Sequence, residues 1–201
     1  MTSTSTTPAW ETYAARYQQL ANTPLDPATV DQWLAQWSDL SKEVGEAYAV
    51  AFRDKDEDTT DEAAQERYLS FVRDILPRSQ QADQALKEKL LALQGWQPAE
   101  QHQQMLRRLR AEAALYREDN VQLEADIAAK ANQYRQITGR MTVTLGGEEL
   151  TFAQASLRLQ DPDRAKREEA WRSMADRRLA DREQLDALYL ELLAMRRQVA
   201  R

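Results

Sequence analysis

The chain has 201 residues, a length that fits one domain or two small ones. Apolar residues make up 42% and charged residues 30%, which is enough apolar content to build a core and argues against global disorder. The chain has only 5 Gly and 6 Pro, and such a low content of turn-forming residues disfavours a turn-rich all-β fold. The absence of cysteine excludes disulfides, thiolate nucleophiles and Cys-bound zinc, and the single histidine excludes a two-histidine metal site within these residues.

The net charge of −6 comes from one acidic segment, residues 54–66, which holds seven acids and one base. A nucleic-acid-binding protein normally carries a concentrated basic stripe, so we expect no nucleic-acid partner. No apolar run approaches the ~20 residues of a membrane span, and the N-terminus lacks the features of a signal peptide. The sequence therefore favours a cytoplasmic protein without membrane contact, with residues 1–9 as a flexible leader.

Residues 10–139 follow the helical period and are expected to form a helical N-terminal domain. Asp26 is expected to cap a helix whose first position is Pro27 and which runs to about Phe52. The aromatic residues of the chain lie mostly at helix-period positions, so we expect them in the core.

Prolines are expected to divide the following helices. The helix after the acidic segment should stop at Pro77, and Ser79 should cap a new helix that ends before Gly95. Pro98 then opens a helical pattern of about 40 residues, which would span ~60 Å if it were straight. We therefore expect a break near Asp119-Asn120.

The period changes from helical to alternating over residues 140–152. Apolar residues alternate with polar ones on both sides of Gly146-Gly147, at Met141, Val143, Leu145, Leu150 and Phe152. This pattern predicts a β-hairpin with a glycine turn. An isolated hairpin is marginally stable in water, so this one should pack on helices. The predicted fold class is mainly α, a multi-helix array with one β-hairpin near 140–152.

Residues 140–201 are assigned as the hairpin followed by a helix pair. Asp161 and Pro162 repeat the arrangement of a cap followed by a proline. The second helix carries apolar residues at alternating steps of three and four, a heptad-like seam that is a candidate interaction face: Leu185, Leu188, Leu192, Met195 and Val199. This pattern still runs at Arg201, so we expect the chain to be truncated within a longer protein.

Two features of the sequence are candidates for metal or ligand sites. Asp54, Asp56 and Asp58 match the first ligands of a calcium loop, but Thr59 and Gln65 stand where that loop needs Gly and Glu, so a solvated acidic loop is favoured. His102 has Glu100 two residues before it, a spacing that does not share a helix face, so a structural role is favoured.

The basic side chains do not mark a binding site either. Arginine clusters at 107–110, 177–178 and 196–197 are interleaved with acids, which is typical of a solvated, salt-bridged face. The sequence contains no P-loop, GxGxxG, GxSxG or HExxH motif. We therefore assign no catalytic and no metal-binding residue, and the substrate-binding residues stay unknown.

Four segments carry a resemblance to a known family. They are MTVTLGGEELTFAQASLRL (141–159), QDPDRAKREEAWRSMADRRLADREQLDALYLELLAMRRQVAR (160–201), SFVRDILPRSQQADQALKEKLLAL (70–93) and LRRLRAEAALYREDN (106–120). Over roughly residues 10–201 the chain resembles the N-terminal part of oligoendopeptidase F, a family of zinc metallopeptidases related to thimet oligopeptidase. The 160–201 segment is the most specific.

The resemblance implies an almost all-helical, two-lobed cytoplasmic protease that hydrolyses short peptides in a deep channel. Its zinc is held by HExxH and a later Glu, which have no counterpart here. This chain would then be a non-catalytic portion that forms one wall of the channel, binds no zinc and is inactive alone. Its partners would be short peptide substrates and the missing C-terminal catalytic half, which should cover an exposed apolar patch. The alternative is a stand-alone helical protein-interaction module.

Overall fold

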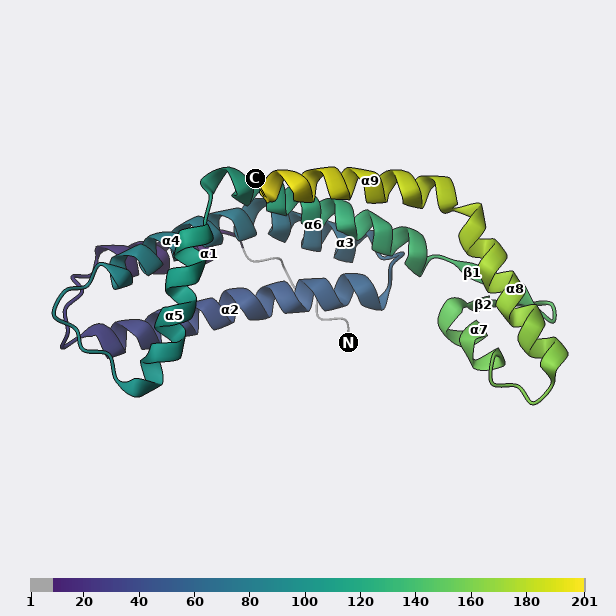
Figure 1. Ribbon diagram of the computed structural model, residues 1–201, viewed down its shortest axis with the longest axis horizontal. Coiled ribbons are helices and arrows are strands. Elements are labelled where there is room, and N and C mark those ends of the chain that lie inside the picture. Colours follow the sequence, from purple (N-terminus) through teal and green to yellow (C-terminus); the bar gives the residue numbers. More distant parts are fainter. Residues whose placement is uncertain (1–8, 201) are drawn as a thin grey trace. The chain divides into compact units, whose positions relative to one another are not determined.

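The computed structural model describes residues 9–200, which form two compact units (Figure 1). Within this range, unit 1 comprises residues 9–57 and 63–126, and unit 2 comprises residues 58–62 and 127–200. The sequence placed a boundary at 139/140 instead. The difference arises because residues 58–62 pack on the end of the helix that precedes the hairpin: Arg140 donates a hydrogen bond of 3.2 Å to the carbonyl of Thr59. The expected leader, residues 1–9, lies outside the described residues except for Ala9.

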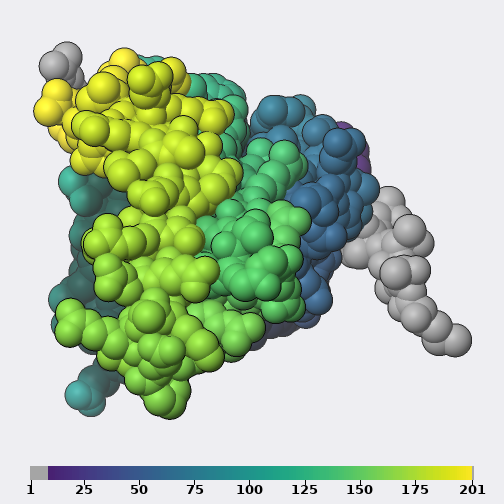
Figure 2. Space-filling model, turned by 90° about the vertical axis from the view of Figure 1, so that its right-hand side faces the viewer, coloured from purple at the N-terminus to yellow at the C-terminus, as the bar shows by residue number. Residues whose placement is uncertain are grey.

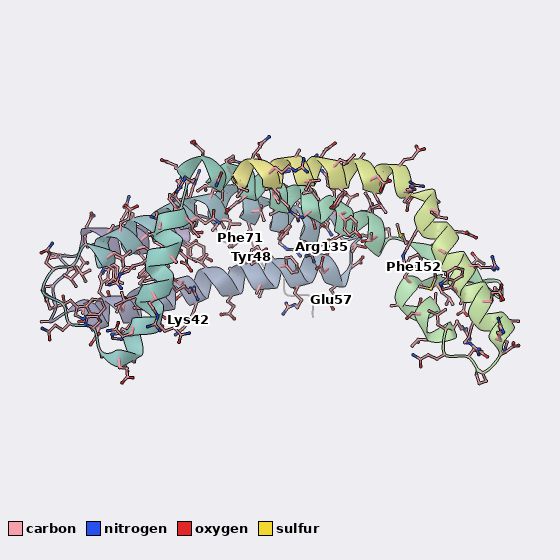
Figure 3. The ribbon with its side chains drawn as sticks, viewed as in Figure 1. Lys42, Tyr48, Glu57, Phe71, Arg135 and Phe152 are labelled. Atoms are coloured by element: carbon pink, nitrogen blue, oxygen red, sulfur yellow. The ribbon has the colours of Figure 1, made fainter. Side chains whose placement is uncertain are left out.

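Unit 1 is built from helices that enclose an aromatic-rich core. Its elements are α1 (Glu11–Asn22), α2 (Val30–Glu57), α3 (Glu62–Ser70), the π-helical turn η1 (Phe71–Ile75), α4 (Leu76–Leu91) and α5 (Glu100–Leu115). Trp33 and Tyr48 show how the helices interlock. The Trp33 indole donates to the Leu20 carbonyl of α1 at 2.9 Å, and the Tyr48 ring of α2 lies 5.8 Å from that of Phe71 (Figure 3).

Helix α2 begins at Val30, three residues after the expected first position at Pro27, and it ends later than expected. The Asp26 carboxylate accepts hydrogen bonds from the backbone N–H groups of Ala28 (2.8 Å) and Thr29 (3.1 Å), which confirms the cap. The helix passes Phe52 and ends at Glu57. Lys55 stabilises this extension because its ammonium lies 4.0 Å from the centre of the Phe52 ring, a cation–π contact.

The predicted stop at Pro77 is wrong. Helices α3 and α4 continue into one another through η1, in which Phe71, Val72 and Ile75 are buried. Proline lacks an N–H for the carbonyl four residues before it, and the wider π turn just ahead of Pro77 accommodates this loss. Ser79 caps nothing, since its hydroxyl donates to the Leu76 carbonyl at 2.9 Å inside α4.

The long pattern after Pro98 breaks between α5 and α6 (Glu118–Gly139), slightly earlier than expected. Tyr116 takes an extended conformation (φ −60°, ψ 135°) and ends α5. The Arg117 guanidinium donates to the carbonyls of Ala114 (3.2 Å) and Tyr116 (2.9 Å), which satisfies groups that the helix end leaves free.

Unit 2 contains the second half of α6 and the predicted hairpin, β1 (Thr142–Leu145) and β2 (Glu148–Thr151). The strands are antiparallel with Thr142 opposite Thr151, and Gly146 (φ 60°) and Gly147 (φ 84°) form the turn. Two consecutive positive φ angles are those of a type I′ turn, which matches the twist of a hairpin. The hairpin packs on helices, as expected, through a small core: Val143, Leu145, Leu150, Ala155, Ala170 and Met174.

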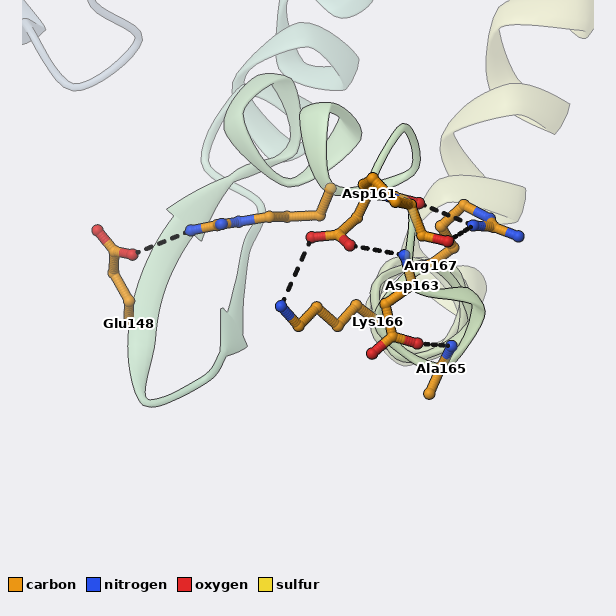
Figure 4. A network of polar contacts seen from close by, with 8 residues as sticks. Glu148, Asp161, Asp163, Ala165, Lys166 and Arg167 are labelled. Carbon is orange, nitrogen blue, oxygen red and sulfur yellow. Dashed lines mark hydrogen bonds and ion pairs between the residues drawn. The ribbon is translucent and has the colours of Figure 1, made fainter.

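Helix caps set the remaining boundaries of unit 2. Phe152 is not in the strand but begins α7 (Phe152–Arg158), because Thr151 and Gln154 form a capping box. Helix α8 (Arg164–Ala180) is capped by Asp163, which accepts from the N–H of Ala165 at 2.8 Å (Figure 4).

The predicted cap at Asp161 is therefore two residues too early. Its carboxylate accepts from the N–H of Asp163 at 2.9 Å and so forms the turn before the helix. Helix α9 (Arg182–Val199) completes the unit. Among residues 9–200, no helix combines the length and the apolar content needed to cross a bilayer.

Candidate functional site

The apolar seam of α9 turns partly inward within unit 2. Leu188 and Leu192 are buried, and Leu185, Met195 and Val199 are half-buried. Leu188 and Ile137 of α6 line the same surface depression, and Lys130 of α6 forms an ion pair with Glu191 beside it. The seam therefore serves packing inside this unit, and its use as a binding face stays a prediction.

Other apolar side chains of unit 2 are exposed. Trp171 of α8 is 61% exposed and Tyr189 of α9 is 59% exposed, so the expectation that aromatic residues lie in the core is wrong for both. Further large apolar side chains are exposed on the same unit, at Leu157, Leu179 and Leu190. Helices α8 and α9 extend over the surface in Figure 2. Helical spacing alone did not separate these residues from the core, because the neighbouring positions of the same helices are also apolar.

The acidic segment does not gather its carboxylates around a cation. Asp54 and Asp56 lie on α2, and each forms an ion pair with the basic residue that precedes it. Asp58 accepts hydrogen bonds from the backbone N–H (2.8 Å) and hydroxyl (2.6 Å) of Thr60, which lower the pKa of its carboxyl. Within the described residues there is no group of three or more His, Asp or Glu that could hold a metal ion.

His102 lies near the start of α5 and borders a cavity of unit 1. Its Nδ1 is buried and lacks a hydrogen-bond partner, with the nearest carboxylate oxygen, of Asp31, at 3.9 Å. Its ring centre is 5.8 Å from that of Trp96. The tilted contact with Trp96 fits the structural role favoured from the sequence, and the free Nδ1 is a polar atom at the cavity edge.

The cavity has a volume of about 760 Å³ and lies between α2, α4 and α5. Its wall is apolar at Leu34, Trp37, Met105 and Leu109. Cavities of several hundred Å³ with an apolar wall and a few polar groups are typical of small-ligand sites.

Asp83 of α4 is the polar group that sequence reasoning missed. Its Oδ1 accepts a hydrogen bond of 2.7 Å from the Trp37 indole, and burial raises the pKa of its carboxyl. Burial, together with the same carboxylate, raises the pKa of the Tyr17 hydroxyl. A signal was present: Asp83 shares a helix face with Leu86 and Leu90, which are both buried, so a charged residue stands in an apolar stripe.

Comparison with known proteins finds the fold of this chain in solved structures, although its sequence matches no known family. No family model and no curated protein matches the sequence. Solved structures do match: PZ peptidase A with an inhibitor (TM-score 0.87, 18% identity) covers 97% of this chain and 35% of its own. A protein assigned as oligoendopeptidase F from Bacillus anthracis strain Ames has a TM-score of 0.86 and 19% identity, with 97% and 37% covered. A second oligoendopeptidase F structure has a TM-score of 0.86 and 20% identity.

The chain shares its fold with part of oligoendopeptidase F. It spans about a third of the length of the solved structures that it matches. The predicted fold class and the resemblance drawn from the sequence are thereby confirmed at the level of the fold.

Proposed function

We propose that this chain is the N-terminal, non-catalytic portion of a cytoplasmic zinc metalloendopeptidase that hydrolyses short peptides. In the whole enzyme it forms one wall of the substrate channel, and its partners are the peptide substrate and the catalytic half. The observation that carries the proposal is the fold likeness, which extends over 97% of this chain but only 35–37% of each peptidase.

The chemistry of the described residues is consistent with this division of labour. Among the described residues, no group of three or more His, Asp or Glu could hold a metal ion, and the proposal assigns the zinc site to the catalytic half. When bound elsewhere in such an enzyme, zinc polarises the scissile carbonyl and activates water. The contribution of this chain is steric: its helices exclude large proteins and hold the peptide next to the catalytic half.

The exposed apolar side chains of unit 2 supply the contact surface that the proposal needs. Trp171, Leu179 and Leu190 are each more than 60% exposed. Exposed apolar side chains that gather on one unit are typical of surfaces that another protein segment covers. We assign this surface of α8 and α9 to the catalytic half.

The test compares the 201-residue chain with the same chain extended by the following codons of its gene. Cleavage of a quenched-fluorescent oligopeptide and the zinc content are measured on the same samples. We expect only the extended chain to bind zinc and cleave the peptide. An extension that is inert and free of zinc contradicts the proposal, and it would favour the stand-alone interaction module, for which the α9 seam is the candidate face.

A further inference from the structure

The cavity of unit 1 contains a half-buried carboxylate, that of Asp83, which makes no ion pair. Asp83 receives a hydrogen bond from the Trp37 indole, a neutral donor. The ammonium group that is nearest along α4, that of Lys87, forms its ion pair with Glu112 instead, at 2.7 Å. Arg108 also binds Glu112, at 2.7 Å, so both cations of the cavity wall are directed to one carboxylate. Asp83 makes no ion pair of its own, although the Tyr17 hydroxyl and the charge of Lys87 oppose the effect of burial on the pKa of its carboxyl.

Partial burial disfavours the charged form of a carboxylate unless a countercharge or hydrogen bonds replace the lost solvent. Burial raises the pKa of Asp83 accordingly. A cationic group brought into the cavity would find its counterion already in place and would hold Asp83 in the ionised form.

The rest of the wall fits an apolar stem. Leu34 of α2 lines the cavity together with Met105 and Leu109 of α5. Trp37 is only 8% exposed and lies beside Asp83. Asp31, with a side chain that is 77% exposed, lies at the outer part of the wall and adds a second negative charge. The cavity thus combines an acidic group at depth with apolar walls and an acidic group near solvent.

We propose that this cavity is a binding site for a basic group on an apolar stem, such as a lysine or arginine side chain, with the cation against Asp83. The stem lies along Leu34, Met105 and Leu109, and Asp31 attracts the ligand electrostatically. This site lies entirely within unit 1 and does not rest on the peptidase proposal. The proposal gives these residues a role in ligand recognition that is separate from catalysis.

The test uses a cation and its neutral isostere. Butylguanidinium and butylurea have nearly the same shape, and only the first is charged. Each is titrated into the 201-residue chain at pH 7 while the indole N–H resonance of Trp37 is followed by NMR, because that group donates to Asp83. We expect butylguanidinium to bind saturably at about 1–10 mM, a range usual for ligands of this size, and butylurea at least about tenfold more weakly.

Two variants locate the effect. Asp83→Asn keeps an acceptor for Trp37 but removes the charge, and it should weaken butylguanidinium about tenfold. Asp39→Asn makes the same charge change on the exposed surface of α2, next to Lys42, and should leave the affinity unaltered. Binding to the unaltered chain should also weaken at pH 4, where Asp83 gains a proton.

The proposal is overturned by any of three results: equal affinity for the two probes, unchanged affinity in Asp83→Asn, or no saturable shift of the Trp37 resonance. If Asp83→Asn does not fold, the comparison of the two probes on the unaltered chain decides. A tenfold preference for the cation then supports the site, and equal binding removes it.

Discussion

The contact between Gly139 and Thr59 makes a quantitative prediction about the packing of unit 2. A Cβ atom at position 139 would lie 2.7 Å from Thr59 Cγ2 and 3.2 Å from its Oγ1. Overpacking of this kind costs about 1–3 kcal/mol. The change from Gly to Ala in a helix returns at most about 1 kcal/mol of propensity. Gly139→Ala should therefore destabilise the chain by about 0–2 kcal/mol in net terms.

Gly45 provides the matched control. It lies in the middle of α2, and a Cβ there would meet nothing within 4 Å. Gly45→Ala should stabilise the chain by about 0.5–1 kcal/mol, because only the helix propensity changes. Urea unfolding followed by circular dichroism measures both free energies.

A double-mutant cycle isolates the clash. Thr59→Ser removes the Cγ2 methyl that is 2.7 Å from the built Cβ and retains the hydroxyl. In that background the cost of Gly139→Ala should fall by about 1 kcal/mol or more, which is a coupling typical of residues in contact. Gly139→Ala that stabilises as much as Gly45→Ala, or a cycle without coupling, would refute the close approach.

Three further predictions concern single side chains. Lys89 donates to the carbonyls of Leu20 (3.1 Å), Ala21 (2.6 Å) and Thr23 at the end of α1, so Lys89→Met should cost about 1.5–3 kcal/mol in urea unfolding, and an unchanged midpoint would contradict the cap. The pKa of Asp83 is raised in the folded state, so its contribution to stability is greatest below the unfolded pKa of about 4 and is lost as the pH rises through the folded value. The stability of the unaltered chain relative to Asp83→Asn should therefore fall between pH 4 and pH 7, and a difference independent of pH would contradict the burial. Gly147 has φ 84°, so Gly147→Ala should cost about 1 kcal/mol or more and lower the melting temperature, an effect that a flexible turn would not show.

The hairpin and the main helices were predictable because their signals are local. Alternation around Gly146-Gly147 fixes a two-residue turn, and Asp26 caps a helix with its own carboxylate. Errors arose where two local signals compete. Asp161 and Asp163 are both cap residues, and only the structure shows that Asp163 takes the helix end. Pro77 breaks most helices, but here a π turn absorbs it.

The candidate cavity was not predictable because it depends on contacts between distant segments. Asp83 contacts Trp37 across 46 residues of sequence, and Lys87 of α4 forms its ion pair with Glu112 of α5. The exposure of Trp171 likewise depends on which segments cover α8, and the helical period of the sequence does not predict this. Sequence patterns predict which face of a helix or strand is apolar. Which faces pack against one another is decided by the tertiary structure.

Residues 58–62, which follow α2 and include the first residue of α3, give this chain an order of assembly. Thr59 belongs to unit 2, and its contact with Arg140 spans 81 residues. A ribosome adding about 5–20 residues per second leaves that segment without its partner for roughly 4–16 seconds. The second segment of unit 1, residues 63–126, is synthesised during this interval, so all of unit 1 is complete before the partner of Thr59 has been made. No single cut in the chain separates the two units intact, so a split into separately expressed halves has to supply residues 58–62 to the second half.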